Sequence, residues 1–228
     1  MKETEYTKIK INTADRPEWL KARRIGIGGS DAAAVLGMNP YKTAEQLLEE
    51  KLADAPDDTP PSLACRHGIH CESFVAELFM EATGLNVRKS NYIYRSARYP
   101  FMLANIDRAV SDPAVRHKHT GTMLHVGGLE CKTTSAYNKN KFGESGAVVK
   151  DGDEGDLPFP MEYYIQATHY MAVTGWEKWY VAALIGNADF RWYKVERDEK
   201  NIRYLIEEEQ KFIERINNEK KARGIKYA

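Results

Sequence analysis

Apolar positions along the chain divide it into helical and extended stretches. The clearest helical stripe lies within residues 198–221, where one face carries Ile202, Leu205, Ile206, Phe212, Ile213 and Ile216. Further helices are predicted at residues 15–25, from Asp31 onward, and at 43–53, 65–83 and 160–174. Gly84 and Gly175 follow the last two and would end them.

Apolar runs bounded by turn residues predict five strands. They are Tyr92–Arg95, Phe101–Val110, Met123–Thr133, Trp179–Ile185 and Phe190–Glu196, the last two joined by a hairpin turn at 186–189. The order of helix, three strands, helix, two strands and helix is typical of an α/β protein. We expect a single domain over residues 1–228, with a central mixed β-sheet flanked by helices.

Composition narrows the class of protein. With 228 residues, 43% of them hydrophobic, the chain is long enough for one sizeable core. Lysines and arginines number 33, and acids also number 33, so the overall charge does not indicate a nucleic-acid-binding protein. No apolar run is long enough to span a membrane, and the N-terminus lacks an apolar signal segment. Three cysteines leave one without a partner, so we expect the reducing cytoplasm.

Acids and a lysine stand where two predicted strands enter the core. On an extended strand, Glu130 and Lys132 point to one face and Cys131 to the other, and Asp107 closes the preceding apolar run. Buried charges are costly unless something uses them, and carboxylate oxygens are the ligands of hard divalent cations. The pattern predicts a metal-dependent phosphodiesterase site, although an acid-x-Lys triplet alone more often forms a surface ion pair.

Two further side chains are expected near this set. Glu72 precedes apolar residues of the 65–83 helix by three, four and seven positions, so it faces the core, whereas Glu77 and Glu81 face away. An inward carboxylate needs a cation or a donor nearby. Gln166 lies on the following helix, within 160–174.

The glycine-rich turn Gly26–Ser30 is the second candidate site. It matches neither the P-loop nor the dinucleotide-binding fingerprint. We expect Ser30 to cap the helix that begins at Asp31 and, together with Arg23, to bind a phosphate at the helix N-terminus. An ordinary loop with a serine cap is the alternative, and the adjacent Arg24 is an equal candidate for the phosphate contact.

Six motifs stand in one collinear series: Arg23–Asp31, Gly68–Glu72, Pro100–Asp107, Leu129–Thr134, Tyr163–Gln166 and Val195–Asp198. The series resembles the lambda-exonuclease/YqaJ viral recombinase family of the PD-(D/E)xK nuclease superfamily, over about residues 16–215. Ile106 departs from the pattern, because at this position, directly before the acid, the superfamily has the proline that gives it its name. The resemblance implies a restriction-endonuclease-like fold.

The resemblance also implies roles for the candidate residues. Asp107, Glu130, the backbone carbonyl of Cys131 and Glu72 would hold one or two Mg²⁺ ions, with Mn²⁺ able to substitute. Lys132 would position or deprotonate the attacking water, with a pKa lowered by the cations. The DNA 5′-phosphate would be bound by Arg23 and Ser30, assisted by Asn105 and Gln166.

The implied function is a Mg²⁺-dependent 5′→3′ exodeoxyribonuclease. It would digest one strand of linear double-stranded DNA, release 5′-mononucleotides and leave 3′ single-stranded tails for phage-type recombination. The implied partners are double-stranded DNA ends, further copies of the chain in a homotrimeric ring, and a phage-type single-strand annealing protein. A ring would confine basic surface to its channel, which accords with zero net charge. The rivals are a site-specific endonuclease on the same core and a noncatalytic DNA-end-binding recombination accessory module.

Weaker patterns favour structural interpretations. The zinc-capable side chains of Cys65, His67, His70 and Cys71 lack a standard spacing and are expected to pack or face solvent. The acidic segment 151–162 lacks the glycine of a calcium loop, and 117–119 reads as an exposed turn. The segment 137–141 holds a tyrosine, an asparagine and two lysines, which suit either a DNA backbone or solvent.

Overall fold

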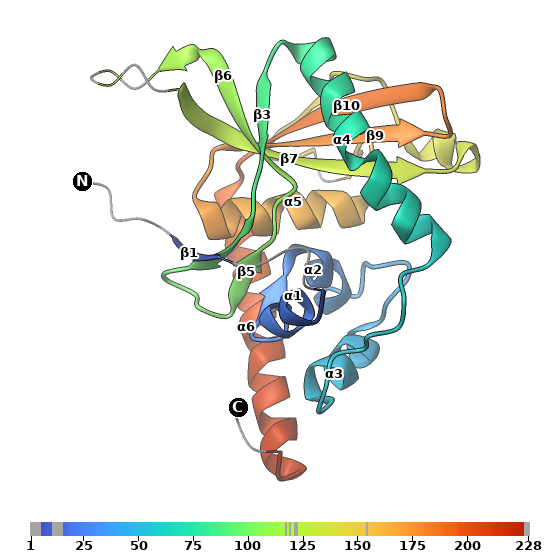
Figure 1. Cartoon of the computed structure of the whole chain (residues 1–228). Helices are drawn as coiled ribbons and strands as arrows, with labels where there is room; N and C mark the ends of the chain where they lie inside the picture. Colours follow the sequence, from blue (N-terminus) through green and yellow to red (C-terminus); the bar gives the residue numbers. More distant parts are fainter. Residues whose placement is uncertain are drawn as a thin grey trace.

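The strands form two sheets, shown in Figure 1. The computed structural model describes residues 6–10, 16–116, 118, 120, 123–153 and 155–225. The first sheet has the order β1-β4-β5-β2 and the second β3-β6-β7-β9-β10-β8. The strands are β1 Tyr6–Lys10, β2 Ile27–Gly28, β3 Asn86–Lys89, β4 Tyr92–Ser96, β5 Met102–Ala104, β6 Arg108–Arg116, β7 Met123–Thr134, β8 Val148–Val149, β9 Lys178–Ile185 and β10 Asp189–Glu196.

Helices connect and cover these strands. They are α1 Arg16–Arg23, α2 Gly29–Val35, α3 Ala44–Leu52, α4 Leu63–Thr83, the 3₁₀ helix η1 Ala136–Lys141, α5 Met161–Thr174 and α6 Glu199–Ala222. Thr43 caps α3 by accepting from the Gln46 N–H, and Asp198 caps α6. Gly84 and Gly175 end α4 and α5 with φ of 69° and 67°, a left-handed conformation that suits glycine.

The predicted mixed α/β architecture is confirmed, but the single sheet is wrong. The second sheet is mixed, because β7 runs parallel to β9 while β6 and β10 run antiparallel to their neighbours. The predicted strand Phe101–Val110 is divided between the sheets at residues 105–107. The ladder between β6 and β7 starts at Arg108 and Leu129, and the Asp107 carboxylate accepts the Cys131 N–H at 2.8 Å. The Asp107 side chain, and not the backbone of a neighbouring strand, therefore accepts this N–H, and the chain passes here from β5 of the first sheet to β6 of the second.

The other predicted elements match the structure within two residues at nearly every end. The 15–25 helix is shorter, as α1, and the helix expected from Asp31 begins two residues earlier, as α2. The hairpin turn at 186–189 is confirmed by the antiparallel pairing of Ile185 with Asp189. The short strands β1, β2, β3 and β8 were not expected, since each is brief and depends on a partner distant in sequence. The short helix η1 was not expected either.

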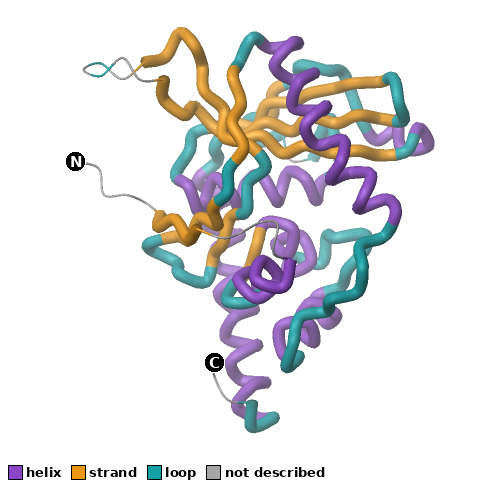
Figure 2. The backbone as a smooth tube through the Cα atoms, viewed as in Figure 1, coloured by secondary structure: helices purple, strands orange, loops and turns teal. Residues whose placement is uncertain are grey.

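Two helices cover opposite faces of the second sheet, as Figure 2 shows. On β9, Val181, Ala183 and Ile185 face a core shared with α5. The alternate residues Tyr180, Ala182 and Leu184 pack with Val75, Ala76 and Phe79 of α4. Both faces are therefore buried, which explains why this strand is an unbroken apolar run. No helix in the described part of the chain is long and apolar enough to cross a membrane.

The apolar stripe of α6 is confirmed as part of the core. A buried acid, Glu209, lies on the same helix. Glu209 is 0% exposed and its Oε1 lies 2.6 Å from Nδ1 of His169, which is also 0% exposed. The Nε2 of this histidine lies 2.9 Å from the Leu103 carbonyl oxygen. Burial acts to lower the pKa of His169, but the Glu209 carboxylate outweighs it and the pKa is raised. The pair joins α5, α6 and β5 behind the candidate site.

Candidate active site

A cavity of about 190 Å³ lies where the two sheets and three helices meet. Its lining comes from the helices α1, α2 and α5, from the strands β2, β4, β5 and β7, and from the segment 105–107. The lining residues are Arg23, Gly28, Gly29, Ser30, Ile93, Leu103, Asn105, Asp107, Glu130, Lys132, Gln166 and Tyr170. Seven of these were predicted from the sequence as site residues, and the fold gathers them around one space.

The basic and acidic groups of β7 form a network with α5. As expected for positions two apart on a strand, Lys132 Nζ lies 2.8 Å from Glu130 Oε1. Gln166 joins both, because its Oε1 accepts from Lys132 Nζ at 2.9 Å and its Nε2 donates to Glu130 Oε1 at 2.7 Å. Gln166 Nε2 also lies 3.0 Å from the Tyr170 hydroxyl. Gln166 therefore contacts the acidic half of the cavity.

The carboxylates suit a divalent cation. Burial raises the pKa of Asp107 well above its usual range, and the carboxylates of Glu130 and Glu72 raise it further. Glu130 is 6% exposed, and its Oε2 is buried without a hydrogen-bond partner. A hard cation would relieve this repulsion and occupy the unpartnered oxygen. Among the described residues, no three His, Cys, Asp or Glu side chains already form a closed metal-binding group.

Glu72 is one reason why the acids do not form a closed metal-binding group, because its carboxylate is bonded elsewhere. It lies at the border of the site and does not line the cavity. Its carboxylate forms a close ion pair with the Arg108 guanidinium, which also donates to the Asp107 carbonyl oxygen at 2.9 Å. The inward acid therefore has a donor, as its position on the helix required. Cys131 points away toward α4, and burial, then Asp107 and Glu130, raises the pKa of its thiol well above its usual range.

The lowering of the Lys132 pKa is expected from bound cations and stays a prediction, because the protein groups alone raise this pKa. Burial acts to lower the pKa of this lysine, but the adjacent Glu130 carboxylate and its hydrogen bond outweigh burial, and the pKa is raised. Lys132 Nζ also lies 4.8 Å from the ring centroid of Tyr163, a cation–π contact that favours the ammonium form. In this arrangement Lys132 is a hydrogen-bond donor.

Arg23 and Ser30 line the same cavity from α1 and α2, and we call this part of the lining the phosphate-candidate half. Arg23 Nη2 donates to Ser30 Oγ at 2.5 Å, and the guanidinium stacks on the Trp19 ring at 4.5 Å. Arg24 points elsewhere, with its guanidinium bonded to the Ala53 carbonyl oxygen. The structure thus separates the two arginines, which the sequence left as equal candidates.

Ser30 is not the helix cap that we expected. The first helical residue is Gly29, and the Gly28 N–H donates instead to Asp31 Oδ2 at 3.2 Å. An aspartate at the third helical position thus accepts the N–H of the N-cap residue, which is glycine and has no side chain to cap the helix. Because α2 has only 7 residues, we base the anion-binding candidate on the Arg23 guanidinium and the Ser30 hydroxyl, and not on the helix N-terminus.

A buried lysine that sequence reasoning missed supports this turn. Lys51 reaches from α3 and its Nζ donates to Asp31 Oδ2 at 2.9 Å, to the Gly26 carbonyl oxygen at 2.7 Å and to the Arg23 carbonyl oxygen at 3.3 Å. Burial acts to raise the pKa of Asp31, but Lys51 and Arg23 outweigh it and lower the pKa. No local pattern marks Lys51, since it ends an ordinary amphipathic helix.

Close packing fixes the glycines of the turn and the far wall of the cavity. A Cβ at Gly29 would lie 2.4 Å from the Tyr170 ring, so only glycine allows α2 to approach α5 this closely. The Tyr170 hydroxyl donates to the Asn105 carbonyl oxygen at 3.0 Å. Tyr170 thereby connects the phosphate-candidate half, the Asn105 segment and Gln166. It was not predicted, although a tyrosine four residues after Gln166 lies on the same helix face.

The weaker sequence patterns remain outside this site. In the described part of α4, Cys71 Sγ lies 3.4 Å from His67 Nε2 and Cys65 is exposed, so these residues are surface or packing groups. Residues 117 and 119, and residue 154 of the acidic segment, lie outside the described residues. In η1, Tyr137 is 96% exposed and Lys139 pairs with Asp189.

Comparison with known proteins agrees with this architecture. The family model for the YqaJ-like viral recombinase domain matches residues 18–177. The uncharacterized protein YqaJ of Bacillus subtilis (strain 168) is 36% identical over 206 residues, which are 89% of this chain. The chain spans 57% of the length of that relative.

Solved structures share the fold at low sequence identity. LHK-Exo in complex with dAMP gives a TM-score of 0.67 at 18% identity and covers 89% of this chain and 93% of its own. A second structure of this alkaline exonuclease from Laribacter hongkongensis gives 0.61. A phage related exonuclease from Haemophilus somnus 129PT gives 0.52 at 12% identity, covering 85% of this chain and 96% of its own. These likenesses establish the restriction-endonuclease-like fold, and the family match establishes that the chain belongs to the YqaJ-like viral recombinase domain family.

Proposed function

We propose that this protein is a Mg²⁺-dependent 5′→3′ exodeoxyribonuclease that digests one strand of linear double-stranded DNA. It releases 5′-mononucleotides and leaves 3′ single-stranded tails for phage-type recombination by strand annealing. The observation that carries this proposal is one cavity of about 190 Å³ lined both by carboxylates with Lys132 and by Arg23 with Ser30. A strand end entering it would meet an anion-binding group and a cation-binding group together.

The acidic half has the donors for the cation. Asp107 and Glu130 would hold one or two Mg²⁺ ions with the Cys131 carbonyl, and Glu72 would join after leaving Arg108. When bound, such a cation activates water and neutralises charge that develops on the phosphate and the leaving oxygen. Arg108 would then remain beside the site as a further positive group.

Lys132 and Gln166 serve the attacking water in this proposal. Lys132 is held by Glu130 and Gln166 at 2.8 and 2.9 Å, so its ammonium group has a fixed direction toward the cavity. A charged donor so oriented can position water and stabilise negative charge on a phosphate oxygen. Gln166 keeps this geometry by binding Glu130 as well.

Arg23 and Ser30 bind the terminal 5′-phosphate in this proposal, and Asn105 and Gln166 line the space between the halves. A guanidinium presents several donors to phosphate oxygens and is the usual choice for this contact. The relatives support the substrate class, since LHK-Exo is an alkaline exonuclease crystallised with dAMP, a mononucleotide. We further propose that the chain acts in the cytoplasm as a homotrimeric ring with a phage-type annealing protein.

Linear duplex should be digested in the presence of Mg²⁺, while closed circular duplex should be spared. Free ends are required because the phosphate-binding half of the cavity receives a strand terminus. Gel electrophoresis of both substrates and chromatography of the products would measure this. Cutting of the circle would favour the endonuclease, and binding without cutting of either substrate would favour the accessory module.

Arg23→Ala should lower the preference for 5′-phosphorylated over 5′-hydroxyl ends by about 10- to 100-fold, the value of one hydrogen bond to a charged group. The ratio of kcat/KM on the two ends measures this preference. Arg24→Ala is the matched control, because that side chain bonds to Ala53 and not to the cavity. Equal losses on both ends with Arg23→Ala would instead indicate a general folding or backbone role.

A further inference from the structure

The strands beside the active-site cavity are basic and contain no acid. Residues 6–10 and 84–106 hold six lysines and arginines and neither aspartate nor glutamate, although acids and bases each number 33 in the whole chain. The six are Lys8, Lys10, Arg88, Lys89, Arg95 and Arg98. These segments form β1, β3, β4 and β5. Although the protein carries no net charge overall, these two segments therefore carry a strong excess of positive charge.

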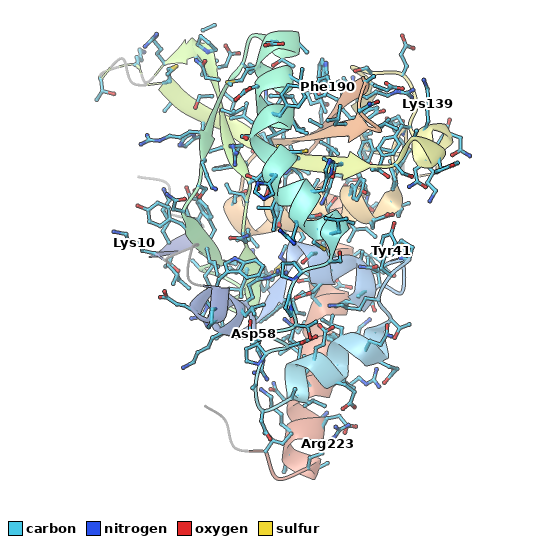
Figure 3. All side chains as sticks on the ribbon, turned by 45° about the vertical axis from the view of Figure 1, so that its right-hand side comes forward. Lys10, Tyr41, Asp58, Lys139, Phe190 and Arg223 are labelled. Atoms are coloured by element: carbon cyan, nitrogen blue, oxygen red, sulfur yellow. The ribbon has the colours of Figure 1, made fainter. Side chains whose placement is uncertain are left out.

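Strand pairing brings several of these charges to one face. In the antiparallel pair of β1 and β4, Lys8 stands opposite Tyr94 and Lys10 opposite Tyr92. Lys8 Nζ lies 5.5 Å from the ring centroids of both tyrosines, so the lysines and tyrosines share a face. Figure 3 shows Lys10 at the left edge of the molecule, far from Lys139 and Arg223.

A third strand adds charge to the same region. His125 of β7 has a lowered pKa, caused first by burial and then by the positive charges of Lys8 and Arg88. Its ring also lies 5.9 Å from that of Trp176, which packs on Tyr94. Groups from β1, β3 and β7 therefore converge, and we name Lys8, Lys10, Arg88 and Tyr92 the basic face.

Nothing in the described part of the chain neutralises this face. Lys8, Lys10 and Arg88 make no ion pair there, whereas α6 pairs Lys211 with Glu208 and Arg215 with Glu45. Like charges that share a face repel one another, and a bound polyanion would remove that cost. Tyr92 is 37% exposed beside them, and a tyrosine hydroxyl can donate to a phosphate oxygen.

We propose that the basic face binds the phosphate backbone of DNA outside the cavity, which rests on the proposed nuclease function. Ile93, between Tyr92 and Tyr94, lines the cavity, so the face lies on the reverse side of the same strand. The cavity receives only the strand end, and the remaining DNA needs a separate, sequence-independent track. Contacts from lysine and arginine to phosphates carry no sequence information and fit that task.

The test neutralises the face and measures the salt dependence of DNA binding. A Lys8→Gln, Lys10→Gln, Arg88→Gln triple variant should bind duplex DNA with a shallower slope of log K against log salt. Each lost phosphate contact lowers the slope by about 0.9, so the triple variant should lose up to about 2.7. Turnover at saturating DNA should stay near that of the wild type, since the cavity is untouched.

The matched control is Lys200→Gln, Arg203→Gln, Lys211→Gln on α6, which changes net charge equally and should leave the slope unchanged. A slope in the basic-face variant equal to that of the wild type would overturn the inference. The inference would also be overturned if the variant bound DNA as the wild type does but no longer bound an acidic protein that the wild type binds. If the triple variant melts below the wild type, Lys10→Gln alone replaces it, with an expected change of about 0.9. Wild-type DNA binding without cleavage would defeat the nuclease proposal but leave the basic face testable by its slope.

Discussion

Asp107→Ala and Glu130→Ala should each lower Mg²⁺-dependent digestion of linear duplex by about 10³-fold or more. Both remove anionic oxygens from the acidic half of the cavity, where the proposed cation would stabilise the transition state by several kcal/mol. Binding of DNA ends should survive, because Arg23 and Ser30 are unchanged. Single-turnover digestion measures the first effect, and fluorescence anisotropy with phosphorylated ends in EDTA measures the second.

Glu196→Ala is the matched control for Glu130→Ala. Glu196 pairs with Lys194 at 2.8 Å, the same length and spacing as the pair of Glu130 with Lys132, and on the same sheet. It lies outside the cavity, so its loss should leave turnover unchanged. Near-wild-type, Mg²⁺-dependent turnover in either active-site variant would defeat the metal assignment.

Lys132→Ala should lower turnover by about 10²- to 10³-fold, the usual cost of removing one positioned donor that stabilises charge in the transition state. Cation binding should be largely retained, because lysine offers no ligand to a metal. Raising the pH should not restore activity fully, since the position of the ammonium between Glu130 and Gln166 is lost along with its proton. Digestion rates across pH and calorimetric titration with Mg²⁺ measure these effects.

Lys194→Ala provides the corresponding control and should behave as the wild type. If calorimetry showed that Lys132→Ala loses metal binding as completely as Glu130→Ala, the lysine would instead hold the carboxylates in place. Its role would then be structural support of Glu130.

The acidic half of the site could be predicted because its geometry is local. Glu130 and Lys132 share a face simply because strand residues two apart do so. The helix position of Glu72 likewise follows from a period of 3.6 residues. Yet Lys194 and Glu196 repeat the same pairing, and only burial separates the two: the Glu130 side chain is 8% exposed and that of Glu196 is 41%.

The division of Phe101–Val110 between two sheets could not be predicted in this way. Its apolar pattern is continuous, and the interruption arises from a bond between the Asp107 side chain and the backbone of Cys131, 24 positions later. The buried pair of His169 and Glu209 is separated by 40 positions and was missed for the same reason. Neither contact leaves a trace in local periodicity.

By itself, then, the sequence determined the α/β class, most helices and strands, and the shared face of Glu130 and Lys132, whereas the predicted turn at Gly26–Ser30 is in fact strand β2 followed by the start of α2. The features that it determined depend on periodicity, capping and alternation, which act over a few residues. Only the tertiary structure decided that Arg23 rather than Arg24 enters the cavity, that Lys51 supports it and that Arg108 binds Glu72. Such choices depend on which distant elements pack together, and that is set by burial across the whole chain.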